Sequence, residues 1–79
     1  MRLDKYLKVS RLIKRRTVAN EACDAGRVIV NGKAARASYD VKVGDEVQIL
    51  LGNREITVEI VSVQETVAKA DATNLYRIK

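Results

Sequence analysis

Three consecutive cations, Lys14, Arg15 and Arg16, come directly before Thr17, and this stretch carries the strongest chemical signal in the chain. Thr17 is a plausible N-cap residue, so the cations lie just before a predicted helix start. A helix N-terminus exposes unpaired backbone N–H groups and the positive end of the helix dipole, and phosphates bind there. Arginine adds parallel N–H donors that match phosphate geometry. The stretch therefore predicts an oxyanion site, with a solvated basic loop as the plainer alternative.

The helix behind these cations is predicted from about Thr17 to Ala25. Small residues recur at spacings of three and four and so share one face: Ala19, Ala22, Cys23 and Gly26. Gly26 stands where a helix would end in a left-handed residue. Because Cys23 lies on the apolar face, we expect a buried structural thiol rather than a nucleophile.

Residues 1–10 predict a short helix in front of the basic stretch. Leu3, Tyr6 and Leu7 share one face of it, and Asp4 falls in the first turn, where its charge suits the helix dipole. The cations of this segment, Arg2, Lys5 and Lys8, lie elsewhere on its surface. Between the two helices, Leu12 and Ile13 are expected to anchor the chain in the core.

Strands are predicted over 27–30, 33–36, 46–51 and 54–63, where apolar residues alternate. Asn31-Gly32 is a strong signal for a two-residue hairpin, and Gly52-Asn53 suits a hairpin with glycine first. The loop 37–45 is expected to close on a turn at its Gly-Asp pair, and the 46–63 hairpin to form core and bind no ligand. Residues 64–79 leave two alternatives, a helix with the stripe Ala68, Ala72, Leu75 and Tyr76, or a final edge strand over 75–78.

The composition is that of one small α+β domain of 79 residues, with two N-terminal helices packed on a small antiparallel sheet. The chain has no Phe, Trp or Pro and three Tyr, so its core must be aliphatic. Its single Cys excludes an intramolecular disulfide and suggests a reducing cytosol. Charges interrupt the N-terminal segment and no apolar run reaches membrane length, so we expect a cytoplasmic protein with no signal peptide and no membrane association.

The charge is divided unevenly along the chain. Residues 1–36 hold ten Lys and Arg against three Asp and Glu, a formal +7, whereas residues 37–79 hold five against seven, a formal −2. A basic half on a small domain is typical of nucleic-acid binding. The three Tyr are scattered at positions 6, 39 and 76, so recognition of RNA shape and backbone is favoured over single-strand stacking.

Residues for catalysis or metal binding are few. The chain has no His, one Cys cannot build a zinc site, and no glycine-rich phosphate-binding motif occurs. Asp40, Asp45 and Glu46 could cluster, but Gly44-Asp45 is better explained as a turn. We therefore expect neither an enzyme nor a bound cofactor, metal or small-molecule substrate.

Four segments together resemble a known family: RLDKYL at 2–7, RRTVA at 15–19, AGRVIVNGK at 25–33 and VKVGDEV at 41–47. They resemble the small RNA-binding domain named after ribosomal protein S-four, over about residues 2–50, with a hairpin return strand and C-terminal segment over 51–79. The whole chain is similar to the stand-alone RqcP-like members, relatives of heat-shock protein fifteen. The resemblance implies two helices on a small antiparallel sheet, with a basic helical face that binds structured RNA.

The same resemblance implies a role in bacterial ribosome-associated quality control. RqcP-like proteins bind large ribosomal subunits blocked by peptidyl-tRNA, contact both ribosomal RNA and tRNA, and work with RqcH, which adds alanine tails. Arg2 and Arg16 match the RNA-contacting arginines of the family most directly. The other residues expected on that surface are Lys5, Lys8, Lys14, Arg15, Thr17, Asn20, Arg27, Asn31 and Lys33.

Two alternatives remain beside a monomeric quality-control factor. One is a general binder of ribosomal RNA or a large-subunit recycling factor, like heat-shock protein fifteen. The other is a protein-interaction adaptor whose basic face docks an acidic protein.

Overall fold

The computed structural model describes residues 1–64 and 74–79 and confirms the α+β class. Its strands form one antiparallel sheet in the order β2-β1-β3-β4-β5. In these residues the elements are α1 (Leu3–Val9), α2 (Arg16–Asp24), β1 (Val28–Val30), β2 (Lys33–Ala34), β3 (Glu46–Leu51), β4 (Arg54–Ile60) and β5 (Tyr76–Ile78).

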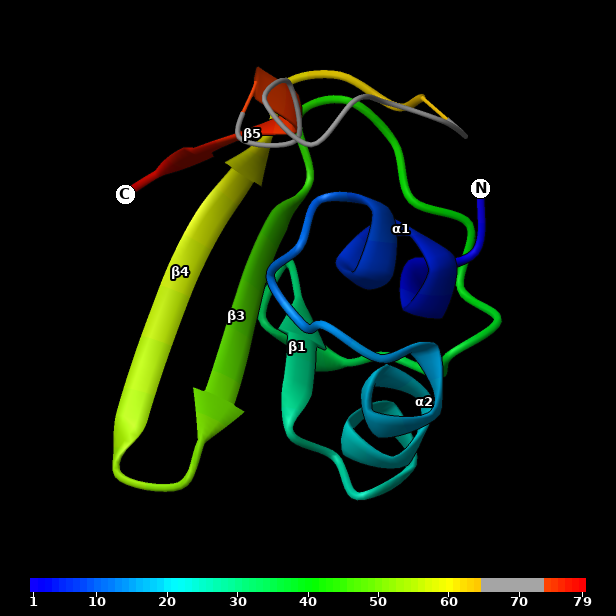
Figure 1. The fold of residues 1–79 in the computed structure, drawn as a ribbon. Helices are drawn as coiled ribbons and strands as arrows, with labels where there is room; N and C mark the ends of the chain where they lie inside the picture. Colours follow the sequence, from blue (N-terminus) through cyan, green and yellow to red (C-terminus); the bar gives the residue numbers. More distant parts are fainter. Residues whose placement is uncertain (65–73) are drawn as a thin grey trace.

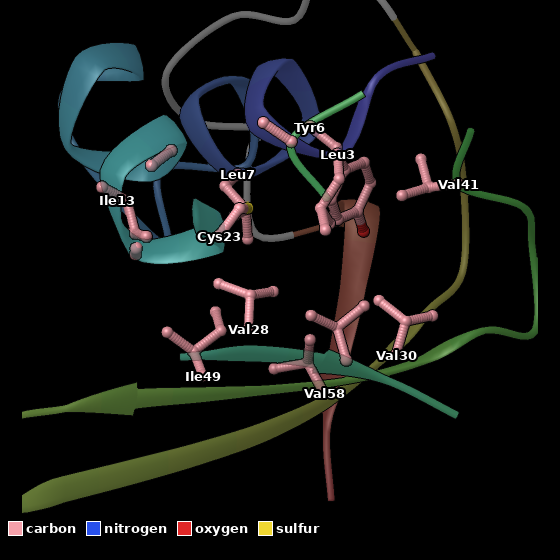
Figure 2. Packing of buried hydrophobic residues seen from close by; sticks show 14 of the residues in the cluster. Leu3, Tyr6, Leu7, Ile13, Cys23, Val28, Val30, Val41, Ile49 and Val58 are labelled. Carbon is pink, nitrogen blue, oxygen red and sulfur yellow. The ribbon is translucent and has the colours of Figure 1, made fainter. Parts of the chain in front are cut away.

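Both helices lie on one face of the sheet, and the core fills the space between these two layers (Figure 1). Figure 2 shows Leu3, Tyr6 and Leu7 of α1 facing the sheet side chains Val28 and Val58. These side chains are buried, and most of the core is aliphatic, as the composition predicts. Core residues come from both the 2–50 segment and the rest of the chain, because the buried cluster includes Val58, Ile60 and Leu75.

The end of α2 has the predicted glycine geometry. Gly26 has φ +74, its N–H donates to the carbonyl of Cys23 at 3.0 Å, and the N–H of Arg27 donates to that of Ala22 at 2.9 Å. These two hydrogen bonds form the Schellman motif, which requires a left-handed conformation at the position of Gly26. Ala22 and Cys23 are buried, which confirms the predicted burial of this cysteine, and burial raises the pKa of its thiol to about 11.

Both predicted hairpin turns are present. Asn31 and Gly32 have φ of 52 and 85, the pair of positive values that a type I′ turn requires. Gly52 has φ 58 at the first position of the other turn, where glycine was predicted. The register of β3 with β4 pairs Val47 with Val58, which places both side chains on the core face.

Three predicted boundaries are wrong. The helix predicted to be capped by Thr17 begins at Arg16, and its N-cap is Arg15, whose extended backbone carbonyl accepts the N–H of Ala19. β2 ends at Ala34, although the strand was predicted to extend to residue 36. β4 ends at Ile60 instead of residue 63, because the N–H groups of the next two residues both donate to the carbonyl of Leu75.

The C-terminal segment resolves in favour of an edge strand. β5 pairs with β4, with Tyr76 opposite Ile60 and Ile78 opposite Val58. The Tyr6 hydroxyl donates to the carbonyl of Leu75 at 2.6 Å inside the core, which ties α1 to the approach of β5. The alternative helix stripe through Ala68 and Ala72 lies outside the described residues. Within the described residues, neither helix is long and apolar enough to cross a membrane.

Candidate nucleic-acid interface

The basic surface is built around one buried carboxylate, that of Asp4, whose side chain is 3% exposed. Arg2 donates from Nε to its Oδ1 at 3.2 Å, and Arg16 donates from Nε to its Oδ2 at 3.3 Å. The amide of Asn20 donates to Oδ2 at 3.3 Å, and the backbone N–H of Lys5 to Oδ1 at 2.8 Å. We call Arg2, Asp4, Arg16 and Asn20 the Asp4 cluster, which joins the start of α1 to the first two turns of α2.

The Asp4 carboxylate is stabilised in its charged form. Burial raises the pKa of this carboxyl, but hydrogen bonds from Arg16, Asn20 and the Lys5 amide lower it by more. The pKa of Asp4 therefore lies below its ordinary value, and the group is ionised at neutral pH.

The two arginines keep donors for a ligand. A guanidinium has five N–H groups, and Arg2 and Arg16 each donate two to Asp4. The other three of each have no partner among the described residues, and the side chains are 51% and 45% exposed. Because one carboxylate serves two guanidiniums, the group keeps a net positive charge and presents oriented N–H groups to solvent.

The helix starts differ in their free backbone donors. In α1, the N–H groups of Leu3 and Asp4 donate to the carbonyls of Tyr39 and Ala37, at 2.8 and 3.2 Å. The Lys5 N–H donates to the Asp4 side chain and the Tyr6 N–H to the Arg2 carbonyl. The first turn of α1 is thus saturated by protein acceptors and offers no backbone donor to an anion.

The first turn of α2 is open. Its N-cap, Arg15, makes no side-chain capping bond, and the turn contains no acidic residue. Arg16, Thr17 and Val18 are exposed, and among the described residues their backbone N–H groups have no protein acceptor. The start of α2, beside the Arg16 guanidinium, therefore offers the free backbone donors that an oxyanion site requires, although Thr17 does not cap the helix.

The predicted site residues fall into groups. Arg2, Arg16 and Asn20 meet at Asp4, and Thr17 joins Arg16 and Asn20 in lining an open hollow at the start of α2. The remaining residues do not belong to that cluster. Lys14 and Arg15 are exposed just before α2, Lys5 and Lys8 are on α1, Arg27 follows the opposite end of α2, and Asn31 and Lys33 are at the β1–β2 turn.

Asn31 has structural partners at both ends of its amide. Its Nδ2 donates to Asp45 at 3.0 Å, and its Oδ1 accepts the backbone N–H of Glu46 at 2.9 Å. Asp45 also accepts the backbone N–H of Lys42 at 2.9 Å, and its pKa is lowered because these bonds outweigh its burial. The predicted turn at Gly44-Asp45 is present, and within the described residues no acidic group is arranged to hold a metal ion.

Three residues near this surface, Asp4, Arg11 and Arg36, were not among the site residues predicted from the sequence. Asp4 was treated only as a helix-dipole residue, although the signal was the presence of a carboxylate between two basic segments. Arg11 is exposed and has φ 62, a left-handed conformation that glycine usually supplies at a helix end. Arg36 is exposed next to Ala37, whose carbonyl accepts the N–H of Asp4.

Comparison with known proteins gives consistent matches. The model of the S4 domain family, named after the ribosomal protein of that number, matches residues 1–47. The RQC P-site tRNA stabilizing factor of Halalkalibacterium halodurans is 58% identical over 79 residues, which cover all of this chain and 90% of that protein. The factor of the same name from Bacillus subtilis is 53% identical over 78 residues, covering 99% of this chain and 91% of that protein.

The fold also matches a solved structure. Heat shock protein 15 of Vibrio cholerae has a TM-score of 0.93 at 31% identity, and the match covers 100% of this chain and 81% of that one. The residues matched by the family model contain α1, α2, β1, β2 and the start of β3, and so include the whole Asp4 cluster. The resemblance inferred from the sequence is confirmed, and the chain belongs to the S4 domain family, among relatives named RQC P-site tRNA stabilizing factor.

Proposed function

We propose that this chain is a non-enzymatic RNA-binding factor of bacterial ribosome-associated quality control. It binds large ribosomal subunits that hold peptidyl-tRNA, contacts both ribosomal RNA and tRNA, and supports alanine tailing by RqcH. The names of its close relatives support this role. The observation that carries it is the Asp4 cluster beside the open first turn of α2, because this geometry suits the phosphates of a folded RNA.

The proposed contact is electrostatic and geometric. The N–H groups of Arg2 and Arg16 that face solvent bind phosphate oxygens, and the backbone N–H groups at the start of α2 bind a neighbouring oxyanion. Asp4 does not contact RNA but holds both guanidiniums in place, which lowers the conformational entropy lost on binding. Lys5, Lys8, Lys14, Arg15, Thr17, Asn20, Arg27, Asn31 and Lys33 complete the proposed surface.

The proposed mechanism is a clamp. A small domain with contacts to two RNAs fixes a tRNA relative to ribosomal RNA and so maintains the geometry that tailing requires. The protein is proposed to act as a cytoplasmic monomer of one domain, with no cofactor. The absence of His from the sequence and the buried, weakly acidic thiol of Cys23 support a role without catalysis.

Co-sedimentation with purified large subunits tests this proposal. The wild-type protein should pellet with subunits that carry peptidyl-tRNA, and Arg16→Ala should reduce the bound fraction by about tenfold. Arg54→Ala is the matched control, because Arg54 is an exposed arginine at the β3–β4 turn and its loss changes the net charge by the same amount.

The outcomes separate the alternatives. Equal binding to empty subunits would favour a general ribosomal-RNA binder. The structural match to heat shock protein 15 is the reason for testing this alternative. Absence of binding to either subunit would contradict the proposal and favour the adaptor with an acidic protein partner. If the protein binds RNA phosphates, its affinity must also fall as the salt concentration rises. The slope of log affinity against log salt concentration should be about −0.7 to −0.9 per phosphate neutralised.

A further inference from the structure

A second hollow lies at the edge of the sheet, away from the Asp4 cluster. It has a volume of about 590 Å³ and lies between the β1–β2 turn and the segment after β2. This is within the size range of small-ligand sites. We call it the β2 groove, and the lining residues that matter here are Lys33, Ala34, Ala35, Arg36, Ser38 and Tyr39.

The β2 groove is basic. Lys33 and Arg36 are exposed cations, and none of the described residues that line the groove is acidic. Ala34, Ala35 and Tyr39 also line the groove and contribute apolar surface to it. A hollow lined by two cations and a tyrosine suits a nucleotide, whose phosphate is anionic and whose base is flat and apolar on its faces.

The tyrosine ring in the groove is held in place before any ligand arrives. The hydroxyl of Tyr39 donates to the Asp45 carboxylate at 2.9 Å, and that carboxylate is itself fixed by Asn31 and by the backbone of Lys42. Tyr39 is half-buried and is one of the residues that line the groove. A fixed aromatic ring costs little entropy when a base packs against it.

The segment that lines the groove is tied by hydrogen bonds to the N-terminus, which carries Arg2. The segment 37–41 pairs with the N-terminus: Asp4 and Leu3 donate to the carbonyls of Ala37 and Tyr39, and Val41 donates to that of Met1. The Met1 ammonium also pairs with Asp40 at 2.6 Å, and a β-bridge joins Arg2 to Asp40. Arg36 and Tyr39 thus belong to a short segment that is fixed against the N-terminus and the start of α1, which carry Arg2 and Asp4.

We propose that the β2 groove holds one unpaired nucleotide of the RNA that Arg2 and Arg16 bind, with its base against Tyr39 and its phosphate on Arg36 and Lys33. This inference rests on the proposed RNA-binding function and adds a local specificity to it. The scattered tyrosines do not form a stacking platform for a strand, but one tyrosine is sufficient for one base. The preferred RNA is therefore a stem with a bulged or flipped nucleotide.

Fluorescence anisotropy with two labelled RNA probes tests the groove. One probe is a stem-loop with a single bulged adenosine, and the other is the same stem-loop without the bulge. Wild-type protein should bind the bulged probe about tenfold more tightly. Tyr39→Leu removes the ring and should abolish this preference while leaving the affinity for the plain stem unchanged, whereas Tyr39→Phe should retain the preference.

Two further variants keep the test decisive. Arg36→Ala removes an exposed side chain and should reduce the preference even if Tyr39→Leu fails to fold, which thermal unfolding would show. Arg54→Ala removes the same charge at the β3–β4 turn and should leave the preference intact. Equal wild-type affinity for the two probes, or a preference unchanged in Arg36→Ala, would overturn the groove alone. Failure to bind either probe would overturn the proposed function, and the groove with it.

Discussion

The helical end of the molecule and its sheet both pair basic side chains with acidic ones, but they do so differently. In the sheet, Arg77 pairs with Glu59 at 2.7 Å and Lys79 with Glu46 at 2.9 Å, one cation to one anion at the surface. At the helical end, one buried Asp4 serves both Arg2 and Arg16. The first arrangement neutralises its charges, whereas the second leaves a net positive charge with a fixed direction.

This difference explains why the Asp4 cluster, and not the ion pairs of the sheet, presents oriented cations. Exposed pairs contribute little to stability and hold no side chain firmly, because solvent screens them. A buried carboxylate requires hydrogen-bonding partners and therefore fixes the groups that satisfy it. The arginines at Asp4 are thus positioned for a ligand, whereas Arg77 of the sheet is engaged with its own neighbour Glu59.

The largest effect expected from this comparison is on RNA affinity. The double variant Arg2→Ala, Arg16→Ala removes both oriented guanidiniums and should weaken binding to large subunits by about a hundredfold. The double variant Arg54→Ala, Arg77→Ala removes the same charge from the sheet and should have an effect of less than about threefold. Comparable losses in the two variants, measured by co-sedimentation at one salt concentration, would show that total charge and not its placement governs binding.

The stability that Asp4 contributes should depend on pH. Asp4→Asn should lower the free energy of unfolding by about 2 kcal/mol at pH 7, less than for a fully buried pair because both guanidiniums are half exposed. The folded-state pKa of Asp4 is lowered, so this contribution is present above its unfolded-state pKa of about 3.9 and is lost as pH falls through the folded-state value.

Urea unfolding of the two proteins between pH 7 and pH 3 measures this contribution. The difference between them should shrink as the pH falls below about 4. A difference that stays constant over the whole range would mean that Asp4 acts through packing and not through its charge.

A smaller effect is expected at the contact that joins the two regions. Tyr6→Phe removes the buried bond from the Tyr6 hydroxyl to the Leu75 carbonyl, and should lower the free energy of unfolding by about 1 kcal/mol. The carbonyl keeps the N–H groups of Val61 and Ser62 as donors, which limits the loss. Chemical denaturation measures this loss, and because the buried Tyr6 hydroxyl contacts Leu75 and not the Asp4 cluster, RNA affinity should stay unchanged.

The smallest effect is at Arg11, where the backbone is left-handed. Arg11→Gly should raise the free energy of unfolding by about 0.5 kcal/mol, because glycine adopts this conformation without a steric penalty. A simultaneous loss of RNA affinity would identify Arg11 as a further contact and explain the presence of a strained arginine. An unchanged affinity would restrict the RNA surface to the residues already named.

The parts of the fold that depend on neighbouring residues were predictable. The bounds of β3, the turns at Asn31-Gly32 and Gly52-Asn53, and the glycine end of α2 are encoded within a few residues and agree with the structure. The start of α2 was not predictable in this way, because local capping preference favours Thr17 as the N-cap. In the structure the helix begins at Arg16, whose side chain reaches Asp4.

The site was predictable in its cations but not in its organisation. Arg2 and Arg16 could be named from their charge and from the family resemblance. Their shared partner, Asp4, could not be named in this way. The hydrogen bonds at Asp4 join residues separated by up to sixteen positions, and only the packing of α1 on α2 brings these residues together. The β2 groove likewise depends on how the segment after β2 pairs with the N-terminus.

The most direct test of the account is the RNA affinity of Asp4→Asn. This substitution removes a negative charge from a surface proposed to bind a polyanion, so an account based on net charge predicts tighter binding. If Asp4 instead holds Arg2 and Arg16 in their binding geometry, the variant should bind RNA about tenfold more weakly although it is more positive. Thermal unfolding should establish that the variant is folded at the assay temperature. Weaker binding by the folded variant is the predicted result, and equal or tighter binding would contradict the positioning role of Asp4.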